Sequence, residues 1–112
     1  MSIKNVTVVD TASKYIVKST GIGSETDEEL VDAEELTGGT DGSKVSLIEC
    51  YHLIEGTGTM TISAGSETLP LTGKGKYGLR PGQLKFGNDK QFKLTTDESV
   101  DSYLLVTEFR RN

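Results

Sequence analysis

The chain contains one histidine and one cysteine, and both lie in the segment from Glu49 to Glu55. His52, with Glu49 and Glu55 near it, has the residue types of a metal site or an acid–base pair, because imidazole and carboxylate bind metals and carry protons. On a strand, however, Glu49 and His52 point to opposite faces, and Glu55 lies beyond its end. We therefore expect no enzyme, no metal and no cofactor, and a partly buried His52 bonded to a neighbouring carbonyl.

Cys50 lies in the same segment, between the large apolar neighbours Ile48 and Tyr51. Such flanks indicate a small buried hydrophobic side chain rather than a reactive thiol. A single cysteine also cannot form an intrachain disulfide or a cysteine-based zinc site.

A second group of chemically capable residues is an acidic run within residues 25–35. Calcium favours several oxygen ligands, but EF-hand spacing is absent and a glycine-rich loop precedes the acids instead of interrupting them. Charge runs are typical of a solvated face. We therefore interpret the run as a candidate protein interface, formed by Glu25, Asp27, Glu28, Glu29, Asp32, Glu34 and Glu35.

Charge is unevenly distributed along the chain. Residues 1–73 hold 4 Lys/Arg against 12 Asp/Glu, whereas residues 74–112 hold 8 against 5. Complementary patches steer and register protein association, so we place the acids and a basic set at contacts between subunits. The basic set consists of Lys74, Lys76, Arg80, Arg110 and Arg111. With a net charge of -5, binding to nucleic acid is disfavoured because phosphate contacts need a basic footprint.

The elements that position these residues are short and β-rich. Alternating apolar runs separated by Gly, Pro, Asn and Asp predict an all-β, single-domain antiparallel β-sandwich or flattened barrel over residues 1–112. Residues 45–54 are apolar on both faces in places, which predicts a central strand, and 59–63 is expected to return as its hairpin partner. Pro70 suggests an edge strand at 67–71. Residues 7–9 form a short β-rich run that predicts a strand, while the segment 1–10 as a whole could be an extended N-terminal arm.

The acidic run is compatible with two structures. Ser24 or Thr26 could cap a helix whose early acids complement its dipole. Alternatively, residues 29–32 form a strand that pairs with residues 15–20. We favour the strand because the apolar stripe is too thin to hold a helix on a core.

The start of the chain lacks the apolar region of a signal peptide, and no apolar run is long enough to span a bilayer. We therefore expect synthesis in a cytoplasm and no membrane partner.

Two resemblances add to this interpretation. The glycine-rich turn Glu55-Gly56-Thr57-Gly58-Thr59 and the later Leu79-Arg80-Pro81-Gly82 resemble the rhythm of a cupin of the ectoine-synthase type. That resemblance implies a barrel topology. Cupin activity depends on a cluster of histidines and a glutamate around a metal, and this chain has only His52. The corresponding alternative is a metal-free, cupin-like small-molecule-binding protein.

The second resemblance covers more of the chain. The segments 14–27, 30–33, 77–82 and 95–106 resemble small structural proteins of tailed bacteriophages, marine and cyanobacterial phages among them. This implies a virion structural protein, most plausibly a capsid decoration (cement) protein located in the virion. The implied partners are the major capsid protein, other virion proteins or copies of the chain in a homo-oligomer. A tail- or fibre-associated structural protein is the related alternative.

Overall fold

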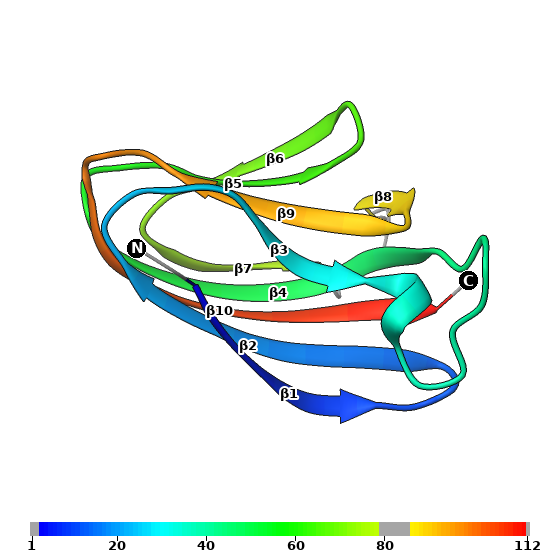
Figure 1. Cartoon of the computed structure of the whole chain (residues 1–112). Coiled ribbons are helices and arrows are strands. Elements are labelled where there is room, and N and C mark those ends of the chain that lie inside the picture. The colour runs from blue at the N-terminus through cyan, green and yellow to red at the C-terminus, as the bar shows by residue number, and fades with distance from the viewer. Residues whose placement is uncertain (1–2, 79–85, 112) are drawn as a thin grey trace.

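The structure is a computed structural model that describes residues 3–78 and 86–111. Figure 1 shows two curved layers of strands that face each other, with both described chain ends on the side of the lower layer. Arg80, expected at an interface, and the rest of the segment 79–82 lie outside the described residues.

Within residues 3–78 and 86–111, ten strands and one short 3-10 helix, η1, follow one another. Their bounds are β1 (Lys4–Asp10), β2 (Lys14–Ile22), β3 (Glu25–Asp32), η1 (Ala33–Glu35), β4 (Val45–Gly56), β5 (Met60–Ala64), β6 (Glu67–Leu71), β7 (Lys74–Gly78), β8 (Phe86–Asp89), β9 (Gln91–Thr96) and β10 (Val100–Arg111).

The strands form two antiparallel sheets. Sheet A has the order β1-β2-β10-β4-β7, with β8 also paired to β4, and sheet B has the order β3-β9-β5-β6. The prediction of an all-β sandwich is therefore confirmed. Pro70 lies on β6, the edge strand of sheet B, which also agrees with the sequence.

Strand β4 is central in sheet A, as predicted, because β10 pairs with one of its edges and β7 and β8 pair with the other. A register shift opposite Glu108 and Phe109 makes Ile48 an extra residue on β4. A bulge of this kind reverses which side chains face inward. The buried apolar side chains accordingly change from odd numbers, Val45 and Leu47, to even numbers, Cys50 and Ile54, and His52 is buried with the second group.

The core fills the space between the two sheets. Phe92 of sheet B meets Phe109 of sheet A edge to face, with ring centroids 4.9 Å apart, and both side chains are fully buried. Leu94 and Leu105 are also fully buried, one from each sheet. Burying a side chain of this size contributes about 1.5–3 kcal/mol. The buried side chains of the two inner faces therefore hold the layers together.

The expected hairpin between residues 45–54 and 59–63 is wrong. Strand β4 belongs to sheet A, whereas β5 pairs with β6 and β9 in sheet B. The connecting turn instead carries the chain from one layer to the other. Gly56 has a φ of +101°, and a Cβ on Gly58 would lie 2.6 Å from Cγ2 of Val100, so this crossing depends on glycine.

Two further expectations are corrected. The acidic run does form a strand, β3, but it pairs with β9 rather than with residues 15–20. Both edges of β2 are already occupied, by β1 and β10, so β3 cannot pair there. The segment expected as an N-terminal arm is strand β1 over Lys4–Asp10, the edge strand of sheet A.

Candidate protein interface

His52 points into the sandwich and is 7% exposed. Its Nδ1 donates to the carbonyl of Gly73 at 3.2 Å, because a carbonyl can only accept. This is the arrangement expected from the sequence. Glu49 lies on the other face of β4, where it is half-buried. Among residues 3–78 and 86–111, no three His, Cys, Asp or Glu side chains are grouped so that they could hold a metal ion.

Cys50 is fully buried next to His52 on the same strand. Burial raises the pKa of the thiol to about 11, because the apolar surroundings disfavour the thiolate. Cys50 is therefore a protonated core residue at neutral pH, as its flanks indicated.

Glu25, the first acid of the run, is a core residue and not a surface residue. It is 2% exposed, and its Oε2 accepts a hydrogen bond from the hydroxyl of Tyr103 at 2.6 Å. Burial, together with the adjacent Glu25 carboxylate, raises the pKa of the Tyr103 hydroxyl above its usual range. Glu25 is thus removed from the expected interface, because it joins β3 to β10 across the two sheets.

Two other acids of the run stabilise the loop that follows it. Asp32 caps η1 by accepting a hydrogen bond from the backbone nitrogen of Glu34 at 3.1 Å. Glu34 accepts one from the backbone nitrogen of Gly42 at 3.0 Å and forms an ion pair with Lys90 at 3.3 Å. These two contacts lower the pKa of the Glu34 carboxyl. Asp32 and Glu34 are therefore half-buried structural residues.

The remaining acids form a surface that we call the acidic edge. Three of its members are exposed and Glu28 is half-buried. Desolvation raises the pKa of Glu29, and the nearby Asp32 and Glu35 raise it further. The acidic edge lies on β3, the edge strand of sheet B, and on η1; it consists of Asp27, Glu28, Glu29 and Glu35.

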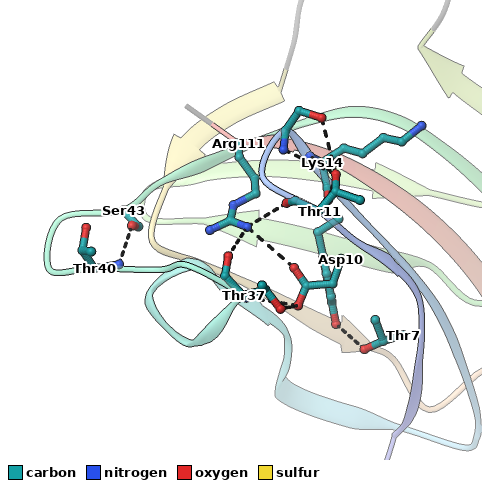
Figure 2. A network of polar contacts seen from close by, with 10 residues as sticks. Thr7, Asp10, Thr11, Lys14, Thr37, Thr40, Ser43 and Arg111 are labelled. Atoms are coloured by element: carbon teal, nitrogen blue, oxygen red, sulfur yellow. Dashed lines mark hydrogen bonds and ion pairs between the residues drawn. The ribbon is translucent and has the colours of Figure 1, made fainter.

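Arg111, predicted as an interface cation, is used inside the molecule. Its Nη1 donates to the carbonyl oxygens of Thr11 at 2.7 Å and Thr37 at 2.5 Å, and it lies 3.6 Å from Oδ1 of Asp10. The other oxygen of Asp10 accepts hydrogen bonds from the backbone and hydroxyl of Thr37. Figure 2 shows this network joining the end of β10 to the β1–β2 turn and to the loop after η1.

The other basic candidates lie at different places. Arg110, Lys74 and Lys76 are exposed. Lys76 forms an ion pair with Glu49 at 3.7 Å across β7 and β4. The expected acidic and basic sets therefore do not form two opposed patches, because part of each is paired within the chain.

A surface that the sequence analysis did not identify is the outer face of sheet A. On β10 the inward side chains of Tyr103, Leu105 and Phe109 are buried, while the alternate Leu104 and Val106 are half-exposed on the other side. We call this outer side the open face. Its apolar members, matched by strand register, are Val6, Val9, Ile16, Ile22, Tyr51, Leu53, Leu104 and Val106.

The register arranges these side chains in rows across the sheet. One row runs Val6, Lys18, Val106, Tyr51 and Lys76. The next row runs Lys4, Thr20, Leu104, Leu53 and Lys74.

Each of these two rows therefore has an apolar centre between lysines. The sequence signal of this face is the run of apolar residues of both parities at 104–106.

The outer face of sheet B has a different character. Its outward positions on β5, β6 and β9 are polar except for Pro70, and among them are Thr61, Ser63, Thr68, Gln91 and Lys93. A hollow of about 290 Å³ on this side is lined by Asp27, Ser63, Gly65, Asp89, Gln91 and Lys93. Antiparallel sheets commonly bury one face and leave a polar face in water. Sheet B follows that pattern, whereas sheet A is substantially apolar on both faces.

Comparison with known proteins adds the following. No family model matches the chain, and no curated protein sequence matches it. Among solved structures, the chain is similar to a cupin domain from Bordetella pertussis, with a TM-score of 0.46 and 10% sequence identity over 99% of this chain and 94% of that one. In the described part of the chain, no helix is both long enough and apolar enough to cross a membrane.

Proposed function

We propose that this protein is a structural component of a bacteriophage particle, a capsid decoration protein that binds the assembled shell and stabilises it. The observation that carries the proposal is the open face. Apolar side chains exposed on one face of a small domain mark a site of contact with another protein, and Val6, Ile22 and Tyr51 on this face are 44%, 58% and 43% exposed. A protein whose outer surface is built for such contacts fits an assembly role.

The acidic edge supports the same role. Asp27, Glu29 and Glu35 are exposed, whereas Glu25 is buried and Asp32 and Glu34 are used inside the molecule. Exposed charges add modest energy to a contact, but they steer association and fix its register. In the proposed mechanism the acidic edge meets basic surface on the shell.

Binding of this kind stabilises a shell by mass action, because a ligand that binds the assembled state and not the free subunit shifts the equilibrium toward assembly. Many copies acting together hold the shell through multivalency, so each individual contact can be weak. A small rigid sandwich suits this use, since little conformational entropy is lost when it binds.

The decisive experiment is quantitative mass spectrometry of purified particles. A decoration protein is expected in a copy number that scales with the number of shell subunits. A few copies per particle would instead place the protein in the tail, and its absence from purified particles would reject the proposal.

A binding assay then tests the acidic edge. Shells that lack the protein are mixed with the parent chain or with a Glu29→Lys, Glu35→Lys variant, and the bound fraction is measured over a range of salt concentrations. We expect weaker binding by the variant. Glu67→Lys is the control, because Glu67 is an exposed acid at the opposite edge of sheet B. Equal binding by the parent and the double variant would remove the acidic edge from the mechanism.

A further inference from the structure

We infer that the free edge of β1 and the slot beside it bind an extended, basic segment of another protein. The segment adds to sheet A as a further strand, and its basic side chains enter the slot between β1 and β3. The inference deepens the proposed function, on which it rests, because it names the chemistry of the partner that the acidic edge meets.

Strand β1 is the outermost strand of sheet A, and one of its two edges is paired with β2 (Figure 1). Within residues 3–78 and 86–111, the backbone groups of Lys4–Val9 form no hydrogen bond outside the ladder with β2. Alternate N–H and C=O groups of an edge strand point away from its neighbour. The second edge of β1 is therefore a template on which another strand can pair.

The other edge strands in the described part of the chain are less suited to this use. Strand β6 contains Pro70, β3 has two register shifts, and β7 alternates lysine with glycine over its first residues. In contrast, β1 is rich in β-branched residues and contains no glycine or proline. Its pairing with β2 is regular from Lys4 to Thr7, and its register shift comes after that run, at Val8. The added strand is therefore expected beside Lys4–Thr7.

A slot of about 290 Å³ opens beside this edge, between β1 and β2 on one side and β3 and the segment after it on the other. Its buried members are Tyr15, Leu30 and Val31, which give it an apolar floor. At its rim, Nδ2 of Asn5 donates to the carbonyl of Glu29 at 2.8 Å and joins β1 to β3. A lysine or arginine side chain suits such a slot, because its stem packs on apolar surface while its charged head reaches polar groups.

Acids outnumber bases around the slot. The cations near it are placed as follows: Arg111 lies beside Asp10, Lys90 is paired with Glu34, and Lys4 and Lys18 lie on the open face of β1 and β2. Lys93 is opposite Glu29 on β9, and among the described residues it forms no ion pair. The carboxylates that line the slot are those of Asp10, Glu29, Asp32 and Glu35.

The carboxyl of Glu29 shows the balance of these charges. Its pKa is raised first by desolvation and then by the nearby Asp32 and Glu35. Lys93 and Lys90 act in the opposite direction, but they do not cancel the rise. A further cation supplied by a partner would therefore stabilise the ionised carboxylates of the slot.

The two faces of β1 specify the pattern of the partner segment. Asn5 and Thr7 point to the slot side, where their side chains bond to buried residues of β2, whereas Lys4 and Val6 lie on the open face. Side chains directly opposite each other in a ladder share a face. We therefore expect basic residues opposite Asn5 and Thr7 and a β-branched residue opposite Val6, with no basic residue opposite Lys4. The partner segment thus alternates basic and β-branched residues.

A second copy of the chain is not the expected partner at this edge. The bond between Asn5 and Glu29 places β3 next to β1. Continuing sheet A across a two-fold axis would therefore bring the β3 strands of the two copies close together. Two acidic edges would then meet and repel, whereas a basic segment brings the opposite charge to the same place.

The first test measures the binding of synthetic peptides to the full chain by isothermal titration calorimetry. The probe is a short peptide of alternating valine and arginine, and we expect it to bind. The same peptide methylated at its backbone nitrogens keeps its charge but cannot pair as a strand, and it should bind at least about 10-fold more weakly. A peptide with glutamate in place of arginine should not bind. Equal binding of the methylated peptide, or no binding of the probe at millimolar concentration, overturns the inference.

The second test addresses the slot with two charge-neutralising variants. Glu29→Gln, Glu35→Gln should weaken binding of the probe about 3- to 10-fold, the range for two exposed ion pairs. The matched control is Glu67→Gln, Glu98→Gln, which removes two exposed acids that do not line the slot. Circular dichroism establishes that both variants are folded. If the two variants lose the same affinity, the probe responds only to net charge and the slot is not its site.

The third test locates the bound peptide by amide hydrogen exchange. In the free chain, the outward amides of Lys4–Thr7 should exchange fast, and the probe should slow them at least about 10-fold while leaving β6 unchanged. Protection of β6 instead would reject the site. Protection of Lys4–Thr7 that rises with the concentration of the chain alone would show that a second copy occupies this edge, and it would also overturn the inference.

These outcomes are distinguishable from those of the particle analysis. A chain that binds the probe at β1 but is absent from purified particles rejects the proposed function and leaves the strand addition in place. A chain that is abundant in particles but does not bind the probe rejects the strand addition alone.

Discussion

The hydroxyl of Tyr103 on β10 donates a 2.6 Å hydrogen bond to Oε2 of Glu25 on β3, and both residues are almost fully buried. This bond joins sheet A to sheet B. The other carboxylate oxygen, Oε1, has no hydrogen-bond partner among the described residues. Glu25 therefore depends on Tyr103 for its side-chain hydrogen bonding, because an unpaired carboxylate is costly to bury.

Substitution Tyr103→Phe should lower the free energy of unfolding by about 1 to 3 kcal/mol, the cost of leaving a buried acceptor without its donor. Glu25→Gln should cost less, since an amide oxygen can still accept the bond. Urea titration followed by circular dichroism measures both changes. Tyr51→Phe is the control, because the Tyr51 side chain is 43% exposed. If Tyr103→Phe unfolds at the parent's urea concentration, the bond contributes no net stability.

Two carboxyls should produce opposite pH effects. The pKa of Glu34 is lowered in the folded state from a usual value of 4.5. Its contribution to stability is therefore present above pH 4.5 and is lost as the pH falls through the lower folded pKa. Glu34→Gln should be less stable than the parent at neutral pH, and the difference should shrink as the pH falls below 4.5.

Ionisation of Glu29 has the opposite effect on stability, because the pKa of Glu29 is raised above 4.5 in the folded state. A raised carboxyl pKa means that ionisation opposes folding, so stability falls as the pH rises from 4.5 through the folded pKa. Glu29→Gln should be slightly more stable than the parent at neutral pH and equal to it below pH 4.5. Thermal unfolding of both variants at several pH values tests this. Differences of the same sign for the two variants would contradict the assignment.

Arg111→Ala should destabilise the fold by about 1.5 to 3 kcal/mol, the range for hydrogen bonds to charged groups. The Arg111 guanidinium holds two carbonyls and lies beside the Asp10 carboxylate, with its side chain only 11% exposed. Arg111→Lys should recover only part of the loss, because an ammonium is a point charge and not a planar fork. Arg110→Ala is the neighbouring control, and its exposed side chain predicts a small effect. Equal unfolding midpoints for the two alanine variants would show that the network of Figure 2 does not stabilise the fold.

Cys50 should be unreactive toward thiol reagents in the native protein. The thiol is buried and its pKa is raised to about 11, chiefly by desolvation, whereas the thiolate is the nucleophile. Modification by an aromatic disulfide at neutral pH should therefore proceed only through unfolding, with a rate that rises with urea concentration. Fast modification without denaturant would show that Cys50 is accessible.

The sequence alone determined the fold class, the burial of Cys50, a partly buried His52 bonded to a carbonyl, and the central place of the strand expected at residues 45–54. These properties depend on alternation between residues i and i+2 and on local turn chemistry, which a single segment contains. The strand form of the acidic run was favoured for the same reason, since its apolar stripe is too thin for a helix.

Only the tertiary structure decided which segments are neighbours. The glycine-rich turn after β4 is compatible with a hairpin, but it crosses between sheets, because β10 and β7 already pair with β4. The same competition for strand edges placed β3 beside β9. The other edge of β2 is occupied by Lys4–Asp10, which is why this part of the expected arm is strand β1.

The tertiary structure also decided which charges are free. Glu25 pairs with a residue 78 positions away, and Arg111 binds a carbonyl 100 positions away. Contacts between such distant residues depend on which strands pair and on how the two sheets are stacked, and no local pattern records either arrangement. The apolar open face was equally hidden, because half-exposed Leu104 and buried Leu105 look alike until the second sheet covers one side and leaves the other bare.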